Sequence, residues 1–131
     1  SDGNLITDYT PSVSSHVDAA DSTWDAVQAG IRRVVTDGSA KSVFAGSPVE
    51  VAGKTGTAQH SKAHADHVLF VGYAPADEPQ IAVSARIAYG YNSGYPAEIG
   101  RDMVRKYFNL ADDADLVTGT ASSLGSEIRG D

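Results

Sequence analysis

The stretch that most constrains the fold is a run of apolar and small residues with one lysine and two threonines near its centre. It reads Val49-Glu50-Val51-Ala52-Gly53-Lys54-Thr55-Gly56-Thr57-Ala58-Gln59. The apolar residues recur at every second position, which predicts a β-strand over about residues 49–58. The same alternation places Thr55 and Thr57 on one face, with Gly56 between them. Such an edge lets a ligand backbone lie close while two hydroxyls and an ammonium bind its negatively charged end.

A nucleotide site is the competing interpretation of this stretch, because Gly53-Lys54-Thr55 could end a phosphate-binding P-loop. That pattern, G-x-x-x-x-G-K-[ST], requires glycine at position 48, where this chain has Pro48. Residues 49–52 also have the pattern of a strand, where a P-loop needs a turn. The sequence therefore favours the strand.

Two further strands are predicted downstream. Residues 67–75 are apolar on both faces, which indicates a strand that is covered on both sides. Residues 80–89 alternate between apolar and polar side chains, and residues 76–79 form the turn. Two such runs joined by a short turn predict a β-hairpin.

Two helices are predicted on either side of the strands. The first covers residues 22–37, with Ser22 and Asp25 as a capping box and Gly38 as the stop. Its buried stripe is predicted to be Trp24, Val27, Ile31, Val34 and Val35. Trp24 is interpreted as a core anchor, with ligand stacking as the alternative.

The second helix is predicted to run from Pro96, a residue that suits a first helical turn, to about Leu110. Its predicted buried stripe is Ile99, Met103, Tyr107 and Leu110. Residues 38–48, rich in Gly, Ser and Ala, are interpreted as a connector.

Several of these segments resemble the class B penicillin-binding proteins, the D,D-transpeptidases that cross-link peptidoglycan. Residues 51–59 are similar to the extended Lys-Thr-Gly element of that family. Residues 70–75, Phe-Val-Gly-Tyr-Ala-Pro, and residues 79–83 form a second, independent match. Residues 2–7, Asp-Gly-Asn-Leu-Ile-Thr, resemble the loop after the family's helical half, although position 8 is Asp where proline is common. Residues 24–35 resemble the helix before the Lys-Thr-Gly strand.

The resemblance implies an α+β fold, a fragment of the penicillin-binding-protein transpeptidase fold. We expect three antiparallel strands in chain order, packed with two helices. Residues 1–110 would form the C-terminal portion of the transpeptidase domain. Residues 111–131 are acidic and rich in Gly, Ser and Thr, and are predicted to be a disordered tail.

The family's other two catalytic elements are missing from the sequence. Its complete site needs a serine and a lysine in S-x-x-K, then S-x-N, then K-T-G. The residues three positions before the four lysines are Gly38, Val51, Gln59 and Met103, so no S-x-x-K exists. The residues two positions before the three asparagines are Asp2, Gly90 and Tyr107, so no S-x-N exists. We therefore expect the chain alone to be catalytically inactive.

The resemblance also assigns roles to the residues that are present. Lys54 would supply positive potential and bond to the serine of the missing S-x-N element. The hydroxyls of Thr55 and Thr57 would hold the carboxylate of the stem peptide or of a β-lactam. The Thr57 backbone N–H would form half of the oxyanion hole, and Gly56 would keep the strand edge open. Without the family context, Lys54 would be equally well explained as a lysine that protects an edge strand.

Charge and composition exclude several classes of function. The 131 residues suit one domain, and the net charge of −7 argues against a nucleic-acid partner. No cysteine is present, so disulfides and thiolate metal sites are excluded. No apolar run approaches the ~20 residues of a membrane helix. The family implies the outer face of a bacterial cell membrane, with an anchor upstream of this chain. The piece itself is expected to be soluble, with no cofactor.

A polar loop at residues 59–67 holds three of the four histidines, which raises a metal-binding alternative. His60, His64 and His67, with Asp66, could bind zinc if the loop were tightly folded. The simpler interpretation is a solvated loop whose histidines titrate near neutral pH. Our prediction is therefore no metal.

A second alternative is a non-catalytic α+β binding module that uses the Lys54–Thr57 edge for carboxylate-bearing ligands. Under the main hypothesis, a piece lacking the rest of its domain exposes an apolar sheet face or edge. We therefore expect self-association, or pairing with the missing part of the domain.

Overall fold

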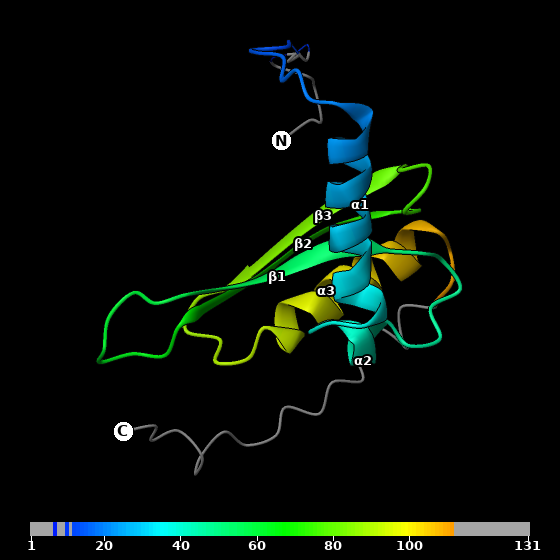
Figure 1. Cartoon of the computed structure of the whole chain (residues 1–131). Coiled ribbons are helices and arrows are strands. Elements are labelled where there is room, and N and C mark those ends of the chain that lie inside the picture. The colour runs from blue at the N-terminus through cyan, green and yellow to red at the C-terminus, as the bar shows by residue number, and fades with distance from the viewer. Residues whose placement is uncertain (1–6, 8–9, 11, 112–131) are drawn as a thin grey trace.

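The computed structural model describes residues 7, 10 and 12–111, and these residues form a three-stranded sheet with helices (Figure 1). The elements in chain order are α1 (Asp21–Thr36), α2 (Lys41–Phe44), β1 (Ala52–Ala58), β2 (His67–Ala74), β3 (Ile81–Ile87) and α3 (Gly94–Tyr107). The predicted α+β class is confirmed. Predictions for residues 2–6 and for the tail at 112–131 lie outside the described residues.

The sheet is antiparallel, in the order β1-β2-β3, as the sequence predicts. Phe70, in the centre of β2, lies opposite Thr55 of β1 and opposite Ala85 of β3. Side chains alternate between two faces, so these three residues share one face, which α2 and α3 cover. Because β1 lies at the edge of the described sheet, the strand that carries the Lys-Thr-Gly element pairs there with β2 alone.

Phe70 is the centre of the core. Its side chain is fully buried, and its ring lies 5.5 Å from the ring of Phe44 in α2. Three glycines surround it, since a Cβ placed on Gly53, Gly72 or Gly100 would come within 3.0 Å of a Phe70 ring atom. The ring thus fills a hollow that only side-chain-free positions in β1, β2 and α3 can provide.

The predicted buried stripe of α3 is wrong. The buried residues are Pro96, Ala97, Gly100 and Val104, whereas Ile99, Met103, Tyr107 and Leu110 are exposed. Small side chains let α3 approach the Phe70 ring closely, and the bulky stripe then faces outward. The helix carries two apolar faces, and close packing on the sheet selects the smaller one.

The predicted stripe of α1 is confirmed only in its second half. Val35 is buried, and Ile31 and Val34 are partly buried. Trp24 is 44% exposed and Val27 is 47% exposed, so the prediction of a Trp24 core anchor is wrong. In Figure 1 the first turns of α1 project beyond the sheet, so within the described chain no element covers them.

The predicted boundaries of α1 need two corrections. The helix begins at Asp21, and its N-cap is Ala20, which makes no side-chain capping bond. The Ser22 capping box is therefore not formed. At the other end the Gly38 N–H bonds to the Arg33 carbonyl at 2.9 Å, which ends the helix close to the predicted stop.

The connector contains a short helix that the sequence analysis did not predict. α2 places Phe44 in the core against Phe70. One turn of helix is too short to show a hydrophobic period, so its position depends on that tertiary contact.

One sheet face is open in the described chain. Val71 in β2 is 50% exposed, and it shares this face with Lys54 and Ser84. The prediction that β2 is covered on both sides is therefore wrong at Val71. Exposure of Val71 agrees with the expectation of exposed apolar surface, whereas Lys54 and Ser84 on the same face are polar.

We expect opposite effects from two glycine-to-alanine substitutions in helices. Gly100→Ala places a methyl group against the Phe70 ring and should lower the free energy of unfolding by about 1–3 kcal/mol. Gly30→Ala in α1 meets no atom within 4 Å and should raise it by roughly 0.5–1 kcal/mol. Urea unfolding of the two variants measures both changes. Stabilisation by both alanines would contradict the packing described for Phe70.

Candidate functional site

The candidate site residues Lys54, Thr55, Gly56 and Thr57 all lie in β1. Strand alternation puts Thr55 and Thr57 on the face that carries Phe70, and Lys54 and Gly56 on the open face. Thr55 is 8% exposed, whereas Thr57 is exposed. The strand therefore offers one buried hydroxyl, one exposed hydroxyl and an exposed ammonium within four residues.

The Lys54 ammonium bonds back to its own strand. Its Nζ donates to the Thr55 carbonyl oxygen at 2.6 Å. An ammonium has three N–H donors, so this bond fixes the direction of the side chain and still allows bonds to a ligand. The bond holds the ammonium at β1, the strand that also carries the two threonine hydroxyls, and a positive charge there suits an anionic ligand such as a carboxylate.

Ser39 joins this group from the turn between α1 and α2. The Oγ atom of Ser39 lies 2.7 Å from Oγ1 of Thr55, although the two residues are 16 positions apart. No periodicity or motif marks Ser39, because only the packing of α1 against β1 brings it to the strand.

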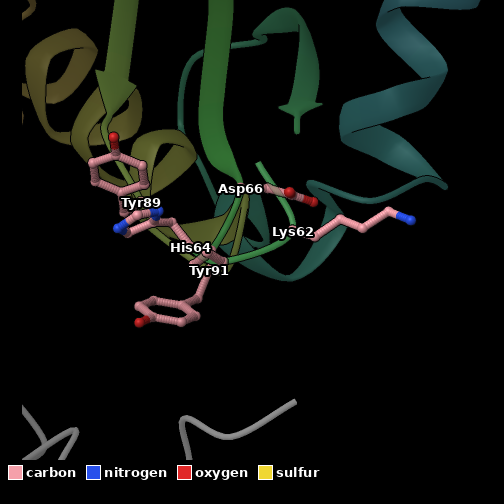
Figure 2. A pocket seen from close by; sticks show the side chains of 7 residues that line it. Lys62, His64, Asp66, Tyr89 and Tyr91 are labelled. Atoms are coloured by element: carbon pink, nitrogen blue, oxygen red, sulfur yellow. The ribbon is translucent and has the colours of Figure 1, made fainter. Parts of the chain in front are cut away.

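A pocket of about 570 Å³ lies at the far end of the sheet, beyond Ala58. Figure 2 shows that it is formed by the loop after β1 and the segment after β3. The side chains of Tyr89 and His64 lie together, with ring centroids 5.2 Å apart, whereas Lys62 extends away from the tyrosines. The pocket is lined by Lys62, Ala63, His64, Ala65, Asp66, Tyr89 and Tyr91.

Three histidines surround Tyr89. The ring centroids of His67, His64 and His60 lie 4.8, 5.2 and 6.1 Å from that of Tyr89. Across the described part of the chain, no group of three or more His, Cys, Asp or Glu side chains could hold a metal ion. The zinc alternative therefore gains no support, and the histidines form an aromatic cluster with tyrosine.

The backbone beside this cluster is strained. Tyr89 and Tyr91 have φ angles of 54° and 61°, a region that bulky residues rarely adopt. The Tyr89 N–H donates to Nδ1 of His67 at 3.2 Å, which helps to hold the turn. Nδ1 can accept this bond only when His67 is neutral.

The surroundings of His67 lower the pKa of its ring below the ordinary value of 6.5. Desolvation makes the largest contribution, and the charges of Arg86 and His60 add to it. Asp66 acts in the opposite direction. The direction agrees with the bond from Tyr89, which also favours the neutral ring.

The sequence matches the family described as "Penicillin binding protein transpeptidase domain" over residues 4–105. The chain belongs to this family. The three strands with their helices agree with that assignment, and the alternative of an unrelated binding module loses its support.

Two relatives show how much of a full-length protein of this kind the chain covers. It is 39% identical over 127 residues to penicillin-binding protein 2A of Bacillus subtilis, which covers 86% of this chain and 18% of the relative. It is 29% identical over 106 residues to peptidoglycan D,D-transpeptidase MrdA of Acinetobacter baumannii, which covers 70% of this chain and 16% of the relative. The chain therefore spans less than a fifth of the length of either relative.

The structural similarity points to the same family. Penicillin-binding protein 2B from Streptococcus pneumoniae superposes with a TM-score of 0.66 and 29% identity, over 84% of this chain and 20% of that chain. None of the described helices is long and apolar enough to cross a membrane.

We expect His67 to titrate below pH 6.5, which NMR of its ring protons measures directly. Arg86→Gln should raise this pKa, because it removes a positive charge that opposes protonation, while desolvation keeps the pKa below 6.5. Arg33→Gln, on exposed α1 surface, is the matched control and should change nothing.

The lowered pKa of His67 also predicts how the free energy of unfolding depends on pH. The unfolded chain binds this proton more readily, so stability is kept above pH 6.5 and is lost as pH falls through the folded-state pKa. A His67 pKa at or above 6.5 in the unsubstituted chain would contradict this account.

Proposed function

We propose that this chain is the carboxylate-binding wall of a peptidoglycan D,D-transpeptidase, and that the nucleophilic serine lies in an earlier part of the same domain. The observation that carries the proposal is the Lys54–Thr57 strand, which lies at the edge of the described sheet, within a chain that matches the transpeptidase family over residues 4–105. The absence of S-x-x-K and S-x-N from the sequence is why the nucleophile is assigned elsewhere.

The proposed reaction is acyl transfer through a covalent serine intermediate. The serine oxygen attacks the carbonyl carbon between the last two residues of a D-Ala-D-Ala stem peptide, while its proton passes to a base. The tetrahedral intermediate collapses, the C–N bond breaks, and D-alanine leaves with a proton on its nitrogen. An amine from a second stem peptide then attacks the ester and releases the serine. Penicillins would acylate the same serine.

The residues of β1 act on the two negative groups that appear in this reaction. The hydroxyls of Thr55 and Thr57 bind the terminal carboxylate of the stem peptide, and Lys54 supplies positive potential beside them. Lys54 also bonds to the serine of the missing S-x-N element. The Thr57 N–H donates to the developing oxyanion, with the amide of the missing serine as the second donor.

The proposal places the whole protein at the outer face of a bacterial cell membrane, where peptidoglycan is cross-linked. The anchor would lie in sequence outside this chain. Neither a nucleic acid nor a cofactor takes part in the proposed chemistry.

Labelling with a fluorescent penicillin tests the proposal. The full-length protein should be labelled, whereas the isolated chain should not, because it holds no S-x-x-K serine. Labelling of the isolated chain, or failure to label the full-length protein, would overturn the proposal.

Two substitutions in the full-length protein test the roles of the strand. Lys54→Met removes the positive charge near the ligand carboxylate, and Thr57→Val removes a hydroxyl that donates to it, so each should slow penicillin acylation by about 10- to 100-fold. Lys41→Met, which changes an exposed lysine of α2, is the matched control and should react at the normal rate. Equal rates for all three variants would show that the β1 side chains do not bind the ligand.

The exposed apolar surfaces imply a partner within the same protein. We propose that the rest of the domain covers Val71 on the open sheet face and the stripe of Ile99, Met103 and Tyr107 on α3. In the isolated chain these surfaces should drive self-association.

Gel filtration of the isolated chain should therefore give a species larger than a monomer. The double variant Val71→Thr, Met103→Lys should shift the equilibrium toward monomer, and Lys62→Met, on a loop away from both surfaces, should not. A monomer at every concentration for the unsubstituted chain is the result that contradicts this expectation.

A further inference from the structure

The hydroxyl of Ser39 lies beside the proposed carboxylate-binding strand. The family's signature elements assign no role to this residue. It lies in the turn after α1, and backbone bonds hold this turn on both sides. The Ala40 N–H donates to the Val34 carbonyl at 3.1 Å, and the Lys41 N–H donates to the Gly38 carbonyl at 3.1 Å. Ser39 is therefore attached to a well-bonded turn and not to a long loop.

Within the part of the chain that the structure describes, the polar side chain that contacts Ser39 is that of Thr55. The two hydroxyl oxygens lie 2.7 Å apart, a normal length for an O–H···O bond. Ser39 itself is exposed, whereas Thr55 is 8% exposed. Only a small part of Thr55 can reach a ligand, so the direction of its hydroxyl proton decides what it can bind.

Each of the two hydroxyls has one proton to donate. If Thr55 donates to Ser39, it has no proton for a carboxylate. If Ser39 donates to Thr55, the Thr55 proton is available, and accepting a bond makes that hydroxyl a better donor. A negatively charged ligand selects the second arrangement, because a carboxylate can only accept.

The β-branched side chain of Thr55 adds to this effect. Threonine is restricted at χ1, so the position of Oγ1 is fixed by the strand and by packing against its neighbours. The rotation of the O–H bond is the freedom that remains, and a bond donated by Ser39 restricts it.

We propose that Ser39 is a positioning residue, whose hydroxyl donates to Thr55 and thereby directs the Thr55 proton toward the ligand carboxylate. The inference rests on the proposed function, because it concerns the same β1 wall. Ser39 acts through Thr55 and does not touch the ligand.

The test compares two penicillins in the full-length protein, benzylpenicillin and its methyl ester, which lacks the negative charge. Ser39→Ala should lower the second-order acylation rate with benzylpenicillin by about three- to tenfold, as expected for one hydrogen bond. The rate with the methyl ester should stay within about twofold of the unsubstituted protein, because a neutral ester makes a much weaker bond to Thr55. The ratio of the two rates therefore isolates the carboxylate contact from any general effect on folding.

Three further variants complete the test. Ser39→Thr keeps a hydroxyl at an exposed position and should restore the ratio. Ser42→Ala, on exposed α2 surface, is the matched serine control and should leave both rates unchanged. In a Thr55→Val background, Ser39→Ala should have no further effect on the ratio, because its partner oxygen is gone.

Three results would overturn this role for Ser39 while leaving the proposed function intact. These are an unchanged ratio in Ser39→Ala, an equal loss with both penicillins, and a loss that adds to that of Thr55→Val, which would mean that Ser39 binds the ligand directly. If the unsubstituted full-length protein reacts with neither penicillin, the proposed function fails, and the role of Ser39 fails with it.

Discussion

The packing of the Phe70 ring against three glycines is the interaction on which the rest of the structure depends. Gly53 and Gly72 let the ring lie close against β1 and β2, and Gly100 lets α3 pack closely on it. Phe44 completes the enclosure from α2. Because Gly53 directly precedes Lys54, the same contact fixes the strand that carries the candidate site. The core and the site therefore share one constraint, and any side chain added at these glycines would move both.

The sequence predicts the strands and helices better than it predicts their buried faces. The period of two in residues 80–89 and the apolar run at 67–75 correspond to β3 and β2. In α3, however, both the bulky stripe of Met103 and the small-residue face of Gly100 are compatible with burial, and periodicity does not rank them. The small-residue face is buried because it lets α3 approach Phe70 closely, and this contact belongs to the tertiary structure. For Trp24, the helical spacing correctly gives its face, but in the described chain nothing covers that part of α1.

In the candidate site, too, some residue positions follow from one strand and others from contacts between elements. The strand position of Lys54, Thr55 and Thr57 could be predicted, because alternation along one strand fixes the direction of each side chain. Ser39 could not, because its contact with Thr55 depends on how α1 packs on β1. Nor could the strained turn at Tyr89 and Tyr91, since tyrosine has no preference for positive φ and gives no signal of such a turn. Local geometry follows from the sequence, whereas contacts between elements require the fold.

The central claim is that β1 binds the carboxylate of a ligand whose carbonyl is attacked from another part of the domain. A crystal structure of the full-length protein acylated by benzylpenicillin tests this claim most directly. We expect the penicillin carboxylate within hydrogen-bond distance of the Thr55 and Thr57 hydroxyls, with the acylated serine contributed by residues that precede this chain. A carboxylate bound away from β1, with Lys54 facing solvent, would contradict the account.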